Sequence, residues 1–190
     1  MKNIAIFASG SGSNFEALAT ACASGKIPAR VAVCVCDKAG AGVIARAQRL
    51  DIPVMVVNPK DFPSKQEYEK AIADRLDLEN VELVCLAGYM RIVGEQLLRR
   101  YGGRIINIHP VLLPAFKGAH AIQDAFDYGV KVYGVTIHFI DHTIDGGTII
   151  AQTPVCYDGN DIQELETMIH KAEHLLYTDT VAALLKEKTQ

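Results

Sequence analysis

The sequence predicts an open α/β fold in which a mostly parallel, twisted sheet is covered by helices on both faces. Short, continuous apolar runs alternate with helical patterns through the first half, as expected for parallel strands buried on both sides. Right-handed crossovers between such strands give a doubly wound arrangement. In the second half, runs that alternate apolar and polar residues predict an antiparallel strand in a mixed sheet.

The expected elements follow in order along the chain. The first half should contain strands at 4–8, 31–36, 54–57, 83–87 and 104–108, and helices at 14–23, 42–50 and 64–78. Strands at 132–140 and 148–156 are joined by a short connection, which favours antiparallel pairing. The last helix is expected over 161–188, where Asp161 and Glu164 resemble a capping box.

Length and composition limit the class of protein. The chain has 190 residues, of which 49% are hydrophobic, enough for a single domain over 1–190. The net charge is -3 and no Lys/Arg run occurs, so we expect no nucleic-acid partner. No apolar run approaches the ~18 residues that span a bilayer, and no signal-peptide pattern follows Met1. We therefore expect a cytoplasmic protein without a membrane partner.

The cysteines predict neither disulfides nor a zinc site. Their number, 5, is odd, and no C-x-x-C pair occurs. Four of them lie in apolar, strand-like runs, so free thiols in a reducing compartment are expected. The positions are Cys22, Cys34, Cys36, Cys85 and Cys156.

Three predicted strands end in segments that suit ligand binding. The first runs into S-G-S-G-S-N at 9–14, the fourth into G-Y-M-R at 88–91, and the fifth into His109-Pro110. In doubly wound folds, ligands lie beyond the carboxyl ends of the strands. These three segments should therefore meet at one edge of the sheet.

The glycine-serine loop is suited to an anion. Glycines allow close approach of the backbone, and free N–H groups at the start of the following helix can hold a phosphate. Two known motifs are absent: Phe15 replaces the third glycine of a dinucleotide fingerprint, and no lysine completes a P-loop. A tight turn capped by Ser13 or Asn14 would explain the same residues without a ligand.

Asn107, His109 and Asp145 form a candidate catalytic set. Residues two apart in a strand point to the same face, so Asn107 and His109 should share a side. Attack of an amine on an acyl carbon creates an oxyanion, which an amide N–H or an imidazole can stabilise. A neighbouring carboxylate favours the imidazolium form, and the turn at Gly146-Gly147 could bring Asp145 close. The alternative is that Asn107 caps a loop, His109 is a satisfied turn histidine and Asp145 is an ordinary turn residue.

Further segments carry a family resemblance along nearly the whole chain. SGSGSNFEAL, AGYMRIV, NIHPVLLPAFKGAHA, GVTIHFIDHTIDGGTIIAQ and a late AEH occur in the order and at the separations typical of phosphoribosylglycinamide formyltransferases. The chain therefore resembles the folate-dependent glycinamide ribonucleotide transformylases of purine synthesis. The resemblance implies a Rossmann-like formyltransferase fold. It also implies formyl transfer from 10-formyltetrahydrofolate to the amine of glycinamide ribonucleotide, without a metal.

The same resemblance implies a role for each site residue. Asn107 and His109 would stabilise the oxyanion, and Asp145 would assist proton transfer. The ribonucleotide would be held by Gly12, Ser13, Asn14 and Glu173. The folate pocket would be lined by Met90, Arg91, Ile92 and Val93, together with Asn107 and the loop that begins at Asp141. Thr136 and His138 fit family positions near the site, and Leu113-Pro114 matches a bond that is often cis.

Two positions depart from the family pattern. Lys65 stands nearest to an arginine that often reaches the folate, and a lysine keeps the charge but lacks the planar fork. Val111 follows His109-Pro110, where serine is more usual. The partners expected are the two small substrates. A second copy of the chain, in a homodimer, is the further partner considered.

Three other functions would explain part of this pattern, and each differs from the transformylase in one recognisable feature. Methionyl-tRNA formyltransferase would need an additional RNA-binding domain and a basic surface. 10-Formyltetrahydrofolate hydrolase usually carries an N-terminal regulatory domain, whereas this chain starts at its first strand, and it would not explain the 9–14 loop. A phosphate sensor would keep the loop without turnover.

A zinc site is the fourth alternative. His170, Glu173 and His174 spell H-x-x-E-H, an inverted zinc-peptidase pattern with two histidines four apart on a helix. No obvious third ligand accompanies them, so we expect no zinc.

Overall fold

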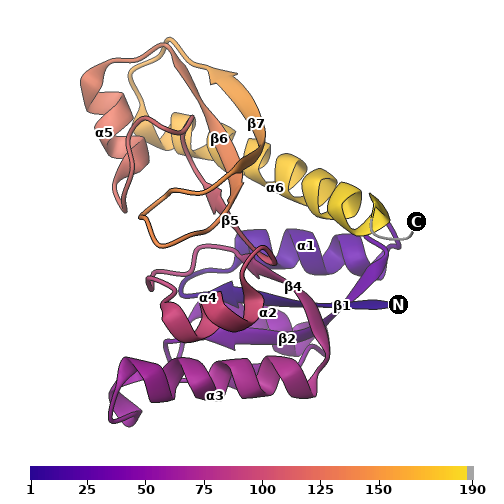
Figure 1. Ribbon diagram of the computed structural model, residues 1–190. Helices are drawn as coiled ribbons and strands as arrows, with labels where there is room; N and C mark the ends of the chain where they lie inside the picture. The colour runs from indigo at the N-terminus through magenta and orange to yellow at the C-terminus, as the bar shows by residue number, and fades with distance from the viewer. Residues whose placement is uncertain (188–190) are drawn as a thin grey trace.

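A computed structural model of the protein describes residues 1–187, and these form one seven-stranded sheet with helices on both faces (Figure 1). The strands are β1 (Lys2–Ala8), β2 (Ala29–Cys36), β3 (Val54–Val56), β4 (Val81–Leu86), β5 (Ile105–His109), β6 (Val132–Phe139) and β7 (Ile149–Cys156). The helices are α1 (Ser13–Ala23), α2 (Gly42–Arg49), α3 (Lys65–Leu78), α4 (Glu95–Tyr101), α5 (Ala121–Tyr128) and α6 (Ile162–Glu187), with a 3₁₀ turn, η1 (Pro59–Asp61).

The topology confirms the predicted fold class. The strand order is β3-β2-β1-β4-β5-β6-β7. The first five strands in this order pair in parallel, whereas β6 is antiparallel to both β5 and β7. The antiparallel strand predicted in the C-terminal half is therefore β6. Parallel pairing up to β5 brings the carboxyl ends of β1, β4 and β5 to one edge.

Each face of the sheet has its own core, and β1 contributes to both. Ile4 and Ile6 pack with side chains of α1, α2 and α6 on one face. Ala5 and Phe7 pack with side chains of α3 and α4 on the other. Figure 1 shows α1 and α3 on opposite sides of the sheet. Because alternate residues of a strand point to opposite faces, a strand buried on both sides must be apolar throughout, as the sequence indicated.

Two helices and the 3₁₀ turn were not anticipated. Both helices are short, since α4 has 7 residues and α5 has 8. Helices of this length depend on tertiary contacts more than on their own propensity. The start of α4 shows this, because the buried carboxylate of Glu69 accepts hydrogen bonds from the N–H groups of Gly94 and Gln96 at 2.6 and 3.2 Å.

The terminal helix was predicted over 161–188 and observed over Ile162–Glu187, so Lys188 lies outside the described residues. The helix is fixed to the sheet by Tyr177, which is fully buried and donates its hydroxyl to the carbonyl of Leu86 at 3.0 Å. The cis peptide bond at Leu113-Pro114 agrees with the resemblance.

All five cysteines are free thiols, as expected, although Cys156 is exposed. Burial raises the pKa of the Cys34 thiol to about 12, which makes this thiol unreactive at neutral pH. No helix within residues 1–187 is both long enough and apolar enough to cross a membrane.

Candidate active site

A cavity of about 480 Å³ lies where the three strand ends meet. It is lined by segments 10–14 after β1, 86–93 after β4 and 107–110 after β5, and by residues 140–145. Six single residues complete the lining: Gly118, Ala119, Ile122, His138, His170 and Glu173. The expected convergence of three segments is therefore present. The loop between β6 and β7 adds a fourth wall through residues 140–145.

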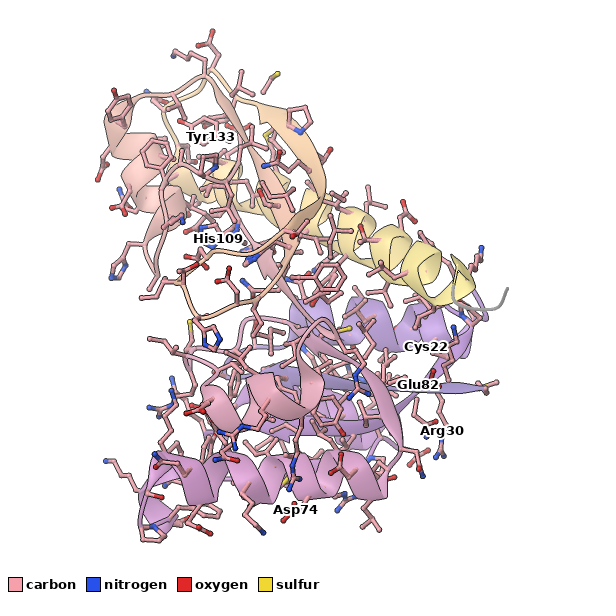
Figure 2. All side chains as sticks on the ribbon, in the orientation of Figure 1. Cys22, Arg30, Asp74, Glu82, His109 and Tyr133 are labelled. Atoms are coloured by element: carbon pink, nitrogen blue, oxygen red, sulfur yellow. The ribbon has the colours of Figure 1, made fainter. Side chains whose placement is uncertain are left out.

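His109 and Asp145 face each other inside the cavity. The Nδ1 atom of His109 lies 3.6 Å from Oδ1 of Asp145, and the two side chains are only 6% and 14% exposed. His109 Nε2 lies 3.1 Å from the Phe116 carbonyl, to which it can only donate. Asp145 Oδ2 accepts the N–H of Gly118 at 2.7 Å. Figure 2 labels His109 close to the loop between β6 and β7, which carries Asp145.

Asn107 stands beside His109 on β5, and both line the cavity, as their spacing predicted. The amide nitrogen of Asn107 lies 3.2 Å from Nε2 of His138. The other ring nitrogen of His138, Nδ1, lies 2.7 Å from the carbonyl oxygen of Gly146. All three members of the candidate catalytic set are thus brought together, with His138 as an additional neighbour.

Thr136 is buried and is not among the residues that line the cavity. Its hydroxyl donates to the Val111 carbonyl at 2.7 Å and accepts from the Leu113 N–H at 3.0 Å. The residue therefore fixes the chain that leaves β5 after His109.

The start of α1 is free of a side-chain cap. Gly12 is the N-cap residue in the left-handed region with φ 79°, and no side chain hydrogen-bonds to the cap. A Cβ atom at Gly12 would lie 2.7 Å from Cβ of Val43, so only glycine fits. Capping by Ser13 or Asn14, the alternative considered from the sequence, is absent. Backbone N–H groups at a helix start without a cap are suited to an anion.

Asn14 and Glu173 connect α1 with α6. The Nδ2 atom of Asn14 lies 3.1 Å from Oε2 of Glu173, and the two residues are 8% and 5% exposed. Oδ1 of Asn14 is buried with no hydrogen-bond partner. His170 Nδ1 lies 2.8 Å from the same carboxylate oxygen, and this contact raises the pKa of His170. All four residues expected at the ribonucleotide site, Gly12, Ser13, Asn14 and Glu173, line the cavity.

Residues 90–93 form an apolar wall on another side of the cavity. Met90 and Ile92 are 63% and 66% exposed beside the cavity they line, while Val93 is nearly buried. Exposed apolar side chains grouped at a cavity are typical of a ligand surface. The residues expected at the folate pocket, Met90, Arg91, Ile92 and Val93, all belong to this wall.

Asp37 orients the polar member of this wall. It follows β2 directly, its side chain is fully buried, and Oδ2 accepts Nε–H of Arg91 at 2.7 Å. Burial acts to raise the pKa of Asp37, but hydrogen bonds from Ser9 and Arg91 outweigh it and hold the pKa below its usual value. The sequence reasoning did not single out Asp37, although its position at a strand end was a usable signal.

The two remaining folate residues differ in placement. Asp141 lines the cavity, and its Oδ1 accepts the N–H and the hydroxyl of Thr143 at 2.7 and 2.6 Å. Lys65 is not among the lining residues; its Nζ lies 3.8 Å from Oε1 of Glu69. The structure therefore does not bring Lys65 together with the others, and its contact with a folate stays a prediction.

The H-x-x-E-H pattern does not assemble a metal centre in the part of the chain that is described. No group of three or more His, Cys, Asp or Glu side chains within 1–187 could hold a metal ion. The carboxylate of Glu173 is directed to Asn14 and His170 instead.

The family model for formyl transferases matches residues 2–181. The chain belongs to the formyl transferase family. Within it, the phosphoribosylglycinamide formyltransferase of Bacillus subtilis (strain 168) is 48% identical over 186 residues, which are 97% of this chain and 95% of that protein. The corresponding protein of Haemophilus influenzae is 38% identical, over 93% of this chain and 84% of its own length.

Solved structures of family members agree with the fold. The phosphoribosylglycinamide formyltransferase from Bacillus halodurans superposes with a TM-score of 0.95 at 47% identity, covering 98% of this chain and 97% of that one. Glycinamide ribonucleotide transformylase 1 from Geobacillus kaustophilus gives a TM-score of 0.95 at 48% identity, covering 97% and 99%. This member of the family therefore has the Rossmann-like architecture of these enzymes, and it is a formyltransferase.

Proposed function

We propose that this enzyme transfers the formyl group of 10-formyltetrahydrofolate to the amine of N1-(5-phosphoribosyl)glycinamide in de novo purine biosynthesis. One observation carries the proposal: a single cavity is lined by the uncapped start of α1, by the apolar wall at 90–93, and by Asn107, His109 and Asp145. The names of the 48% and 38% identical relatives, which cover nearly the whole chain, support the same acceptor.

The ribonucleotide is assigned to the α1 end of the cavity. Its phosphate would accept N–H groups from Gly12, Ser13 and Asn14, helped by the helix dipole. The carboxylate of Glu173 can accept hydroxyl groups of the ribose, since a carboxylate is a pure acceptor. The pterin of the donor would lie against the apolar wall, where Met90 and Ile92 present exposed surface.

The reaction begins when the amine lone pair attacks the formyl carbon. A C–N bond forms, and the carbonyl oxygen becomes an oxyanion, which the Asn107 amide and the His109 imidazole stabilise by donating hydrogen bonds. The amine then loses a proton, which a water molecule would carry to His109 as His109 gives its own proton to N10 of the folate. The bond between N10 and the formyl carbon breaks in the same step, and the oxyanion re-forms the carbonyl. The carboxylate of Asp145, whose Oδ1 lies 3.6 Å from Nδ1 of His109, would help to orient that water.

The hydrogen bond from His109 to Phe116 bears on this step. Its Nε2–H is held by the Phe116 carbonyl at 3.1 Å, so the reacting group must replace that carbonyl before the proton can be donated. Phe116 has φ 48°, which is unusual for a residue other than glycine, and it lies on the segment that follows the cis bond.

Donor consumption tests the function. Purified protein is mixed with 10-formyltetrahydrofolate, and loss of the formyl donor is followed with and without glycinamide ribonucleotide. We expect loss that requires the acceptor and produces one formylated ribonucleotide per donor consumed. Loss at the same rate without acceptor would indicate a hydrolase, and no loss in either case would favour a phosphate sensor.

A further inference from the structure

His138 is a buried imidazole in the cavity to which the proposed chemistry assigns no role. It is 1% exposed and lies on β6, directly opposite Asn107 in the antiparallel pairing of β5 with β6. Directly opposed residues of antiparallel strands place their side chains on the same face and in contact. The contact here joins Nε2 of His138 to Nδ2 of Asn107 at 3.2 Å.

The surroundings of the ring determine which nitrogen carries a proton. Nδ1 of His138 lies 2.7 Å from the carbonyl oxygen of Gly146 and 2.9 Å from that of Phe139. Carbonyl oxygens only accept hydrogen bonds, so Nδ1 must be the donor, and in the neutral ring Nε2 is then an acceptor. The group that faces Nε2 must therefore donate, and the NH₂ end of the Asn107 carboxamide does so.

We propose that His138 is a positioning residue that acts through Asn107, an inference that rests on the proposed function. The fixed Nδ1–H tautomer holds the carboxamide nitrogen with one of its two N–H groups. The second N–H is left for the oxyanion in the cavity. If the carboxamide of Asn107 turned over, its oxygen would face Nε2, two acceptors would oppose each other, and the cavity would lose its amide donor.

A double-mutant cycle in the kinetics separates this role from a purely structural one. His138→Asn places a side-chain amide near the position of Nδ1, so a donor to Gly146 is kept while the acceptor for Asn107 is lost. We expect kcat to fall about 10- to 100-fold, less than the roughly 10²- to 10³-fold for deleting an oxyanion donor, with both KM values changed by less than about twofold.

The decisive comparison is the effect of His138→Asn in an enzyme that already lacks the Asn107 side chain. In an Asn107→Ala enzyme, adding His138→Asn should change kcat by less than about twofold, because the group through which His138 acts is gone. An equal fall in kcat in both backgrounds would overturn the proposal. The matched control is His120→Asn, a change of the same kind at an exposed histidine outside the cavity lining, which should keep the wild-type kcat.

Two further measurements keep the proposal testable. Should His138→Asn not fold, His138→Gln offers the reverse experiment: its amide oxygen reaches the position of Nε2, so kcat should stay within roughly threefold of wild type. A fall in kcat as large as that expected for His138→Asn would overturn the proposal. Imidazole ¹⁵N NMR of the ligand-free protein should show His138 as the Nδ1–H tautomer, and an Nε2–H tautomer would contradict it.

Failure of the wild-type enzyme to formylate the ribonucleotide would refute the proposed function instead. The NMR experiment requires no turnover, and it would still report whether the ring presents an acceptor to Asn107.

Discussion

His109 and Asp145 face each other at a distance longer than an ordinary hydrogen bond. Nδ1 of His109 lies 3.6 Å from Oδ1 of Asp145, and both side chains are nearly buried. Asp145 is already oriented by the Gly118 N–H at 2.7 Å. The carboxylate is therefore positioned before any substrate arrives, which suits a group whose contribution is made in the transition state.

Replacing Asp145 by asparagine tests this role. The Asp145→Asn side chain keeps the shape and an oxygen for Gly118 but loses the charge. We expect kcat to fall by about 10²- to 10⁴-fold, the range for loss of acid–base assistance, while Kd for the ribonucleotide changes by less than about threefold. Steady-state kinetics and calorimetric titration measure the two quantities. Unchanged turnover would refute the mechanism.

Asn14 can be used to test whether the ribonucleotide binds at the α1 end of the cavity. Its side chain is buried against Glu173, and it follows the uncapped start of α1. Replacing Ser13 and Asn14 by alanine should weaken ribonucleotide binding roughly 10- to 100-fold, the equivalent of one or two hydrogen bonds to a charged group. Binding of the formyl donor, measured by titration, should remain close to wild type.

Ser24→Ala at the opposite end of α1 serves as the control, because its hydroxyl only donates to the Ala21 carbonyl. If donor binding fell in the Ser13/Asn14 variant while ribonucleotide binding did not, the phosphate would have been assigned to the wrong end of the cavity.

Asp37 gives a prediction about pH. Because the folded protein lowers the pKa of this carboxyl, its pairing with Arg91 stabilises the fold above the ordinary pKa, about 3.9, and this contribution is lost as the pH falls through the lower folded value. Asp37→Asn should reduce the free energy of unfolding at neutral pH. The difference from wild type should shrink between about pH 5 and pH 3, as measured by urea denaturation. A difference independent of pH would contradict the assignment.

At the scale of elements, the short helix α4 depends on a side chain from α3. The buried carboxylate of Glu69 accepts the N–H groups of Gly94 and Gln96, and it thereby satisfies two donors at the start of the helix. Segment 88–93 of the cavity wall ends where this cap begins. Local sequence could not predict α4, because the acceptor lies 25 residues away from Gly94 along the chain.

Glu69→Gln should therefore affect both stability and the wall. A glutamine can offer its oxygen to one N–H, but its NH₂ end opposes the other. We expect the free energy of unfolding to fall by about 2 kcal/mol and KM for the formyl donor to rise. Urea denaturation and steady-state kinetics measure these effects. The control is Glu67→Gln, the same change of charge at an exposed position on α3, and equal losses in both variants would count against the cap.

The pairing register of β5 with β6 could not be predicted from the sequence either. Asn107 and His138 lie 31 residues apart, and only the pairing of β5 with antiparallel β6 makes them neighbours. A shift of one residue would turn every side chain of β6 to the other face. The sequence could indicate that β6 has two different faces, but the partner of each residue depends on the assembled sheet.

At the scale of the whole molecule, the predictable part was the edge of the sheet. Continuous apolar strands indicated a buried parallel sheet, and the strand-end rule then grouped the 9–14 loop, the 88–91 segment and His109. The structure shows all three around one cavity. Roles for individual residues came from the family resemblance, because spacing alone does not distinguish a catalytic imidazole from a turn histidine. Lys65 illustrates the limit, since it lies outside the cavity lining.

Transfer of a labelled formyl group tests the central claim, that one cavity holds a phosphorylated amine acceptor and a formyl-folate donor across Asn107, His109 and Asp145. Donor labelled with ¹³C in the formyl group is supplied with either glycinamide ribonucleotide or its dephosphorylated ribonucleoside, and mass spectrometry follows the label. The label should appear in the formylated ribonucleotide, with a kcat/KM at least about 10-fold above that for the ribonucleoside. Label released as formate, or equal kcat/KM for both acceptors, would contradict it.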